Sequence, residues 1–189
     1  MAKSLEEIPD DTPLPKGHCV RATTYEDANL MHNLVAGRSC TGILHFLNGT
    51  PVDYFSKRQG QVETATHGSE FVAACIAVEQ IIDLRYTLRM MGVPIYGKSW
   101  SFGDNKGAVQ SPTIPHSKLS KRWCALSYHR VREAIAADYI AFLHMEGKKN
   151  PSDVLTKLLK EINMKDFVIP IMNFKGDTLD YLPKGDDDS

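Results

Sequence analysis

The pattern of apolar and polar residues first predicts a group of antiparallel strands. Residues 18–28 and 41–59 are rich in β-branched and aromatic residues, which favour extended structure. Within the second segment, Asn48 and Gly49 form the dipeptide that most readily adopts the positive φ angles of a tight hairpin turn. Three antiparallel strands are therefore predicted, the first of which ends near Asp27.

The period then changes from that of strands to that of helices. In residues 68–92, apolar residues recur every three or four positions and form one stripe along a helix that ends at Gly92. The strand-like run KSWSFG follows and ends at Asp104. The remaining patterns predict a helix, a strand and a last helix, over residues 120–139, 140–146 and 150–162.

This order of elements predicts an α/β fold. A hairpin-led start followed by alternating strands and helices gives a five-stranded mixed sheet, with three antiparallel and two parallel strands and helices packed on it. Binding sites in open sheets of this kind form at the carboxyl ends of the strands. Asp27 and Asp104 both stand at such predicted ends.

Acidic residues from separate elements are predicted to meet there. Glu70 falls in the first turn of the first predicted helix, and Asp153 begins the last one, so both are expected near Asp27 and Asp104. Crowded carboxylates repel one another unless a divalent cation neutralises them. Oxygen donors without Cys or His favour Mg²⁺ or Mn²⁺ over zinc, and two such ions about 4 Å apart can promote phosphodiester cleavage.

Each acid also has an ordinary structural interpretation. Asp104 follows a glycine and could be a turn former. Asp27 could cap a short helix over residues 28–34. Glu70 suits the positive end of a helix dipole, and Asp153 completes a capping pattern that begins at Asn150. On the residues alone, both interpretations stay open.

Composition narrows the class of protein. A hydrophobic content of 42% and a charged content of 24% are typical of a folded globular chain. The net charge of -1 gives no overall basic signature, so nucleic-acid binding would need local positive charge. The cysteines are scattered singly, which favours neither zinc nor disulfides. No apolar run approaches the roughly 18 residues of a membrane span, so we expect an intracellular protein, cytoplasmic or nuclear, without a membrane partner.

The two ends of the chain differ from its middle. Residues 1–17 combine acids and prolines with few apolar residues, which predicts a flexible leader. Residues 161–189 form a C-terminal extension with an acidic tail, and its apolar run at 167–172 is expected to be buried. The folded domain is therefore predicted to cover residues 18–160.

A series of short motifs runs along that domain in the order DANL, RSCTG, SKRQ, TATHGSEFVAA, GDNKGAV, HSKLSKRWCALSYHRVRE and SDVLTKLL. In order and spacing they resemble the ribonuclease H domain of copia-type long-terminal-repeat retrotransposons, over residues 24 to 160. The resemblance implies the RNase H-like fold. It also implies hydrolysis of the RNA strand of an RNA/DNA hybrid by an endonuclease that uses two Mg²⁺ ions, with Mn²⁺ as a substitute.

The resemblance also assigns residues. Asp27, Glu70, Asp104 and Asp153 match the family's metal-binding and catalytic carboxylates. The family's second acid and its tryptophan are replaced here by Asn29 and Leu30, which leaves Asp27 in place. The implied substrate-binding residues lie beside Asp104 and in the HS motif with the basic residues after it: Asn105, His116, Ser117, Lys118, Lys121 and Arg122.

Other functions remain open at this stage. One is an RNase H-like module without activity that binds nucleic acid or serves as a scaffold beside a reverse transcriptase. Another is a related two-metal nuclease or integrase that acts on DNA. Retention of all the acids favours the enzyme. A reverse transcriptase domain of a parent polyprotein is the implied protein partner.

Overall fold

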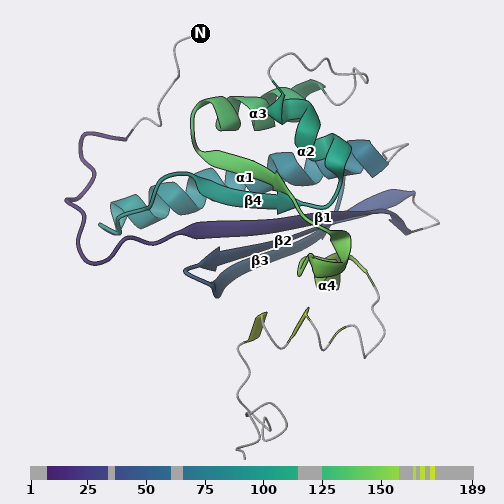
Figure 1. Cartoon of the computed structure of the whole chain (residues 1–189), viewed down its shortest axis with the longest axis horizontal. Helices are drawn as coiled ribbons and strands as arrows, with labels where there is room; N and C mark the ends of the chain where they lie inside the picture. The colour runs from purple at the N-terminus through teal and green to yellow at the C-terminus, as the bar shows by residue number, and fades with distance from the viewer. Residues whose placement is uncertain are drawn as a thin grey trace, which may run out of the picture.

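A computed structural model describes residues 8–33, 37–60, 66–114, 125–157, 164, 167–168 and 171–172. Its strands form one sheet in the order β3-β2-β1-β4-β5 (Figure 1). The pairs β1–β2 and β2–β3 are antiparallel, whereas β1–β4 and β4–β5 are parallel, so the predicted mixed sheet is confirmed. The strands are β1 (Ala22–Asn33), β2 (Arg38–Leu47), β3 (Thr50–Arg58), β4 (Ser99–Gly103) and β5 (Ile140–His144).

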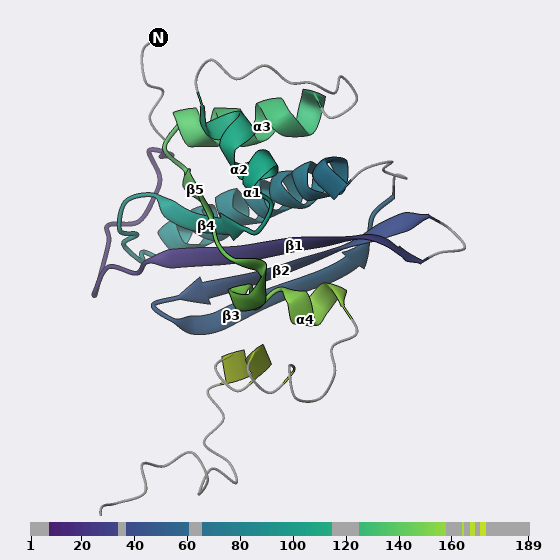
Figure 2. The same ribbon diagram turned by 45° about the vertical axis from the view of Figure 1, so that its right-hand side comes forward.

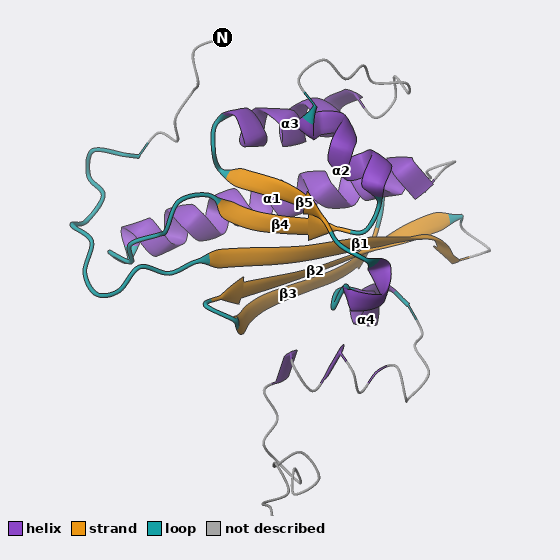
Figure 3. Cartoon of the chain, in the orientation of Figure 1, coloured by secondary structure: helices purple, strands orange, loops and turns teal. Residues whose placement is uncertain are grey.

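Helices cover the two faces of the sheet unequally. Figure 2 and Figure 3 show α1, α2 and α3 on one face and the short α4 on the other. The helices are α1 (Thr66–Met90), α2 (Lys106–Thr113), α3 (Ala125–Ala136) and α4 (Asp153–Thr156), and a 3-10 turn spans Gly147–Lys149. No helix in the described ranges is long and apolar enough to span a bilayer.

The main core lies between the helices and the sheet. Side chains of α1, α2, α3 and β5 pack together there, and the cluster consists of Ala74, Val78, Ile81, Val109, Val131, Ala134, Ile140 and Phe142. Arg85 of α1 is buried with them, and its guanidinium donates to the Gly97 carbonyl and the Ser99 hydroxyl at 3.0 Å each. The Arg85 hydrogen bonds therefore tie α1 to the start of β4 and to the segment just before it.

Strand β1 is longer than its sequence pattern indicates. It continues past Asp27 to Asn33 because β2 pairs with it as far as Asn33 and Arg38. The expected strand end near Asp27 is therefore wrong, and so is the alternative of a helix over 28–34 capped by Asp27, because residues 28–33 are strand. Parallel pairing of β1 with β4 stops at Tyr25, however, so Asp27 still lies just past the point where the two strands separate.

The segment before α4 is tied to β1 by Asn150. This side chain is fully buried, and its amide donates to the Glu26 carbonyl at 2.7 Å. Its Oδ1 accepts from the backbone N–H and the hydroxyl of Ser152, at 3.2 and 2.6 Å. Asn150 therefore closes the turn before the helix, and α4 begins at Asp153. The predicted helix over 150–162 is described as helical only to Thr156.

Residues 167, 168, 171 and 172 of the C-terminal extension lie against the sheet face that carries α4. Phe167 and Ile171 line a hollow of about 510 Å³ together with Tyr25 and Phe46 of the sheet. A second hollow of about 450 Å³ joins Val168, Ile171 and Met172 to side chains of β2, β3 and α4. The apolar run thus meets an apolar sheet surface, in a helical rather than an extended conformation at the described positions.

Candidate metal centre

Three aspartates meet where β1 and β4 separate. Asp27, Asp104 and Asp153 each offer one carboxylate oxygen, and these atoms all lie within 4.8 Å of one another. Asp27 comes from the middle of β1, Asp104 follows β4 and Asp153 begins α4. Asp27 and Asp153 are buried, whereas Asp104 is half-buried. The cluster is thus closed on the protein side and accessible from solvent beside Asp104.

The backbone around Asp104 is held on both sides. The Met145 N–H donates to the Gly103 carbonyl at 3.0 Å, and His144 Nε2 lies 3.0 Å from the Asp104 carbonyl. Gly147 closes over the carboxylate so tightly that a Cβ there would lie 2.9 Å from Asp104 Oδ2. His144 therefore contacts the backbone of the site, and Gly147 packs closely against the Asp104 carboxylate.

Two residues of the α4 segment bind the Asp27 carboxylate directly. The Thr156 hydroxyl donates to Asp27 Oδ2. Lys157 Nζ lies 3.4 Å from Asp27 Oδ1 and 2.7 Å from Asp153 Oδ1. Sequence reasoning did not single out either residue, although both belong to the motif SDVLTKLL.

Glu70 approaches the cluster from α1. The helix begins at Thr66, so Glu70 lies in its second turn rather than the first. Its oxygens are not among the three gathered atoms, but the side chain is only 4% exposed. Burial raises the pKa of Glu70 to about 10, with further contributions from the negative charges of Asp27, Glu26 and Asp104. Glu70 therefore lies close enough to the aspartate cluster for the charges of Asp27 and Asp104 to raise its pKa.

Glu26 is a further acid that the strand pattern did not reveal. It neighbours Asp27 in β1, is 1% exposed, and has no hydrogen-bond partner for Oε2 in the described part of the chain. Burial raises its pKa well above the ordinary range, and Asp27 and Asp104 raise it further. An alternating pattern predicts only that a side chain faces the core, so nothing in it distinguishes this glutamate from an apolar residue.

The cluster has the properties of a site for a hard divalent cation. Burial and the charge of Asp27 raise the pKa of Asp104. Burial also raises the pKa of Asp153, despite its bond to Lys157. A divalent cation would relieve both the repulsion and the loss of hydration, because it binds anionic oxygens in place of water. The donors are all oxygens, so the set fits Mg²⁺ or Mn²⁺.

Gly42 allows α4 to approach the site. It pairs with Asp27 in the sheet, and a Cβ on it would lie 2.7 Å from Thr156 Cγ2 and 2.8 Å from Leu155 Cβ. Both distances are shorter than carbon atoms tolerate. A side chain at position 42 would push α4, and Asp153 with it, away from Asp27.

We expect Gly42→Ala to destabilise the protein by about 2 kcal/mol, because overpacking at a tight contact costs about that much. It should also weaken Mn²⁺ binding, since Asp153 moves with α4. Urea denaturation and calorimetric titration measure the two effects. Gly60→Ala is the matched control, because a Cβ there meets nothing within 4 Å. Equal stability of the two variants would contradict the close-approach explanation.

The predicted substrate-binding residues are placed only in part. The Asn105 side chain accepts the Ala108 N–H at 3.1 Å and caps α2. This gives Asn105 a structural task beside Asp104. The other five lie outside the described residues: His116, Ser117, Lys118, Lys121 and Arg122.

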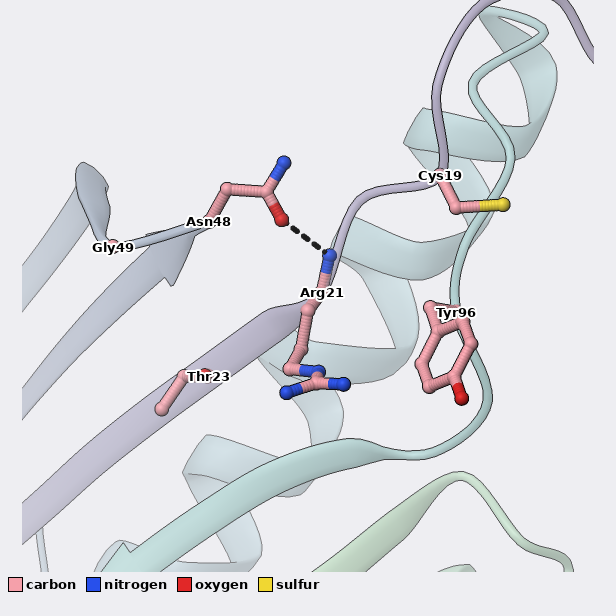
Figure 4. Close-up of a pocket in the computed structure, with 6 residues that line it drawn as sticks. All are labelled: Cys19, Arg21, Thr23, Asn48, Gly49 and Tyr96. Carbon is pink, nitrogen blue, oxygen red and sulfur yellow. Dashed lines mark hydrogen bonds between the residues drawn. The ribbon is translucent and has the colours of Figure 1, made fainter.

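A separate hollow lies near the N-terminal end of β1. It measures about 520 Å³ and is lined by Arg21, Asn48 and Tyr96, among others (Figure 4). The Arg21 guanidinium lies 4.4 Å from the ring centre of Trp100, and Asn48 Oδ1 accepts the Arg21 N–H. Asp27 lies six positions after Arg21 along extended chain, which is roughly 20 Å away. The hollow shares no residue with the acid cluster.

Sequence comparison finds relatives among plant transposon proteins. The chain is 25% identical over 136 residues to the retrovirus-related Pol polyprotein from transposon TNT 1-94 of Nicotiana tabacum, which covers 71% of this chain and 10% of that protein. It is 23% identical over 156 residues to the retrovirus-related Pol polyprotein from transposon RE2 of Arabidopsis thaliana, and the match covers 82% of this chain and 11% of that protein. The chain thus spans about a tenth of these relatives. No protein-family model matches it.

Solved structures with a similar fold include ribonucleases H. RNase H1 of Halobacterium salinarum NRC-1 aligns with a TM-score of 0.56 and 17% identity, over 72% of this chain and 94% of that one. LC11-RNase H1 in complex with an RNA/DNA hybrid aligns with a TM-score of 0.54 and 16% identity, over 72% of this chain and 94% of that one. A foamy viral protease-reverse transcriptase, also in complex with an RNA/DNA hybrid, aligns with a TM-score of 0.52 and 15% identity, over 85% of this chain and 22% of that one.

The two kinds of comparison agree with each other and with the resemblance carried by the motifs. The structural neighbours show the fold at low identity, and the sequence relatives are retrotransposon polyproteins. The chain therefore has the ribonuclease H fold and is related to one segment of retrotransposon Pol polyproteins.

Proposed function

We propose that this domain is a ribonuclease H that hydrolyses the RNA strand of RNA/DNA hybrids with the help of divalent metal ions. The observation that carries the proposal is the approach of three aspartate oxygens to within 4.8 Å at the point where two parallel strands separate. A binding module would have no need to bury several carboxylates against one another, because their repulsion costs stability.

The metal ligands in this proposal are Asp27, Glu70, Asp104 and Asp153, and they would hold two Mg²⁺ ions, with Mn²⁺ as a substitute. When bound, the ions would neutralise the phosphate, polarise its phosphorus–oxygen bonds and lower the pKa of a water. The protein itself holds the carboxylates at fixed directions, through Thr156 on Asp27 and the contacts around Asp104. Burial of Asp27 excludes bulk water from the protein side of the site.

Substrate contacts are proposed in the basic segment before α3. Lys118, Lys121 and Arg122 would bind phosphates of the hybrid, because positive charge must be local in a chain whose net charge is -1. His116 and Ser117 complete the same motif, and Asn105 lies beside Asp104 at the solvent side of the cluster. The binding of hybrids by structural neighbours supports this substrate class.

The protein partner in this proposal is inferred from the similar proteins. The chain corresponds to a small part of Pol polyproteins, and one structural neighbour combines protease and reverse transcriptase. We therefore include a reverse transcriptase domain of a parent polyprotein in the proposal. The competing candidate is an inactive module with the same fold, and the presence of all four acids favours the enzyme over it.

The test is a cleavage assay with labelled RNA/DNA hybrid, duplex RNA and duplex DNA, in Mg²⁺, in Mn²⁺ and in chelator. We expect cleavage of the RNA strand in the hybrid alone, and its loss in chelator. Hybrid binding without cleavage in either metal would support the inactive module. Cleavage of duplex DNA would instead support a DNA nuclease.

A further inference from the structure

The ammonium group of Lys157 lies between two of the clustered carboxylates. It is 2.7 Å from Asp153 Oδ1 and 3.4 Å from Asp27 Oδ1. Lys157 follows the last turn of α4, so Asp153 is its i−4 neighbour and Asp27 reaches it from β1. The lysine thus bridges two elements that are far apart in sequence, at two of the three carboxylates of the candidate metal site.

This contact differs from an ordinary surface ion pair. The Asp27 side chain is 1% exposed, whereas that of Lys157 is 34% exposed. A buried carboxylate that loses its partners is costly, and Asp27 has a partner on each oxygen, Lys157 on Oδ1 and Thr156 on Oδ2. Among the described residues, Lys157 supplies the cation that pairs with both Asp27 and Asp153.

A metal ion at the same carboxylates would conflict with this arrangement. A divalent ion binds carboxylate oxygens at about 2.0–2.6 Å, so it would stand within a few ångströms of the ammonium group. Like charges at that separation repel strongly in a partly buried site. The long, partly exposed stem of Lys157 allows the ammonium group to move towards solvent.

We propose that Lys157 is a positioning residue whose ammonium group holds Asp27 and Asp153 together in the metal-free protein and competes with the metal ion for them. This inference rests on the proposed metal site. In the metal-free protein the lysine keeps the carboxylates close enough to receive an ion. Once an ion binds, the ammonium group withdraws to the mouth of the site, on the side from which a phosphate would approach.

The test compares Lys157→Met, which removes the charge but keeps much of the stem, with Lys157→Arg, which keeps the charge. In chelator we expect Lys157→Met to melt about 5 °C below the wild type, because two buried carboxylates lose their counterion. In calorimetric titration it should bind Mn²⁺ about tenfold more tightly, because the competing charge is gone. Saturating Mn²⁺ should close the gap in melting temperature. Lys157→Arg should stay close to the wild type in both measurements.

Lys149→Met is the matched control, because Lys149 pairs with Glu146 at 3.0 Å on an exposed surface. It should change neither the chelator melting temperature nor the Mn²⁺ affinity. Unchanged or weaker Mn²⁺ binding by Lys157→Met would overturn the proposal, as would an unchanged melting temperature in chelator. If neither the wild type nor Lys157→Met bound Mn²⁺, both the proposed function and the competition would be contradicted. If the wild type cleaved the hybrid and Lys157→Met matched it in Mn²⁺ affinity and in melting temperature, only this inference would be contradicted.

Discussion

Asp104→Asn is expected to reduce cleavage of the RNA/DNA hybrid by about 1000-fold or more, which corresponds to roughly 4 kcal/mol of transition-state stabilisation. Asp104 is the half-buried member of the cluster and stands at its solvent side, where a substrate phosphate must arrive. Asparagine has nearly the same shape, but it offers one neutral oxygen in place of an anionic carboxylate. The rate of cleavage under single-turnover conditions is the measurement.

The fold should survive this substitution. Burial and the charge of Asp27 raise the pKa of Asp104, so the ionised form is under repulsion that an amide does not feel. We therefore expect a melting temperature in chelator at or above that of the wild type. Asp53→Asn is the control, because Asp53 is an exposed β3 residue paired with His45 in the sheet. Cleavage by Asp104→Asn within tenfold of the wild-type rate would remove Asp104 from the proposed site.

Local patterns predicted those parts of the fold that depend on local chemistry. The hairpin at Asn48 and Gly49 has φ angles of 51° and 84°, which is the left-handed geometry that this dipeptide favours. The stripe of α1 was predicted from its period, and the helix ends at Met90, two residues before the predicted Gly92, which takes the left-handed φ of 72° just past the helix end. The mixed sheet followed from the order of the elements.

Features set by distant contacts were not predictable in this way. The extension of β1 beyond Asp27 depends on pairing with β2, which overrides the local pattern that predicted a strand end near Asp27. Helix α2 was missed because its eight residues include glycine, proline and few apolar side chains, and it depends on the Asn105 cap. Thr156 and Lys157 acquire their roles only when α4 packs on the sheet beside Asp27.

The candidate metal site, like the fold, has parts that the sequence predicted and parts that depend on distant contacts. The sequence predicted that Asp27, Asp104 and Asp153 would meet where neighbouring strands end. They do meet, but at the point where β1 and β4 separate, because Asp27 lies in the middle of β1. It did not indicate that Glu26 would be buried without a partner for Oε2. Nor did it show how deeply Glu70 would be buried, and that depth determines how the metal-free site responds to pH.

Glu70→Gln is expected to stabilise the metal-free protein at alkaline pH. Burial and neighbouring acids raise the pKa of Glu70 to about 10, from an ordinary value of 4.5. The folded state therefore keeps a proton that the unfolded chain releases, so wild-type stability in chelator falls as pH rises from about 4.5 to about 10. Glutamine does not titrate, so at pH 8.5 the variant should be more stable by up to about 5 kcal/mol, since each pH unit above 4.5 costs the wild type about 1.4 kcal/mol. The difference should vanish near pH 4.

Urea denaturation in chelator across this pH window measures the effect. Glu79→Gln is the matched control on the same helix, because Glu79 is exposed and its bond to Arg130 lowers its pKa. That variant should gain nothing at alkaline pH. In saturating Mn²⁺ the wild type should become more stable than Glu70→Gln, because the ion stabilises the ionised wild-type carboxylate and glutamine is a weaker ligand. Parallel pH profiles for wild type and Glu70→Gln in chelator would show that Glu70 is ionised in the folded protein without a metal ion.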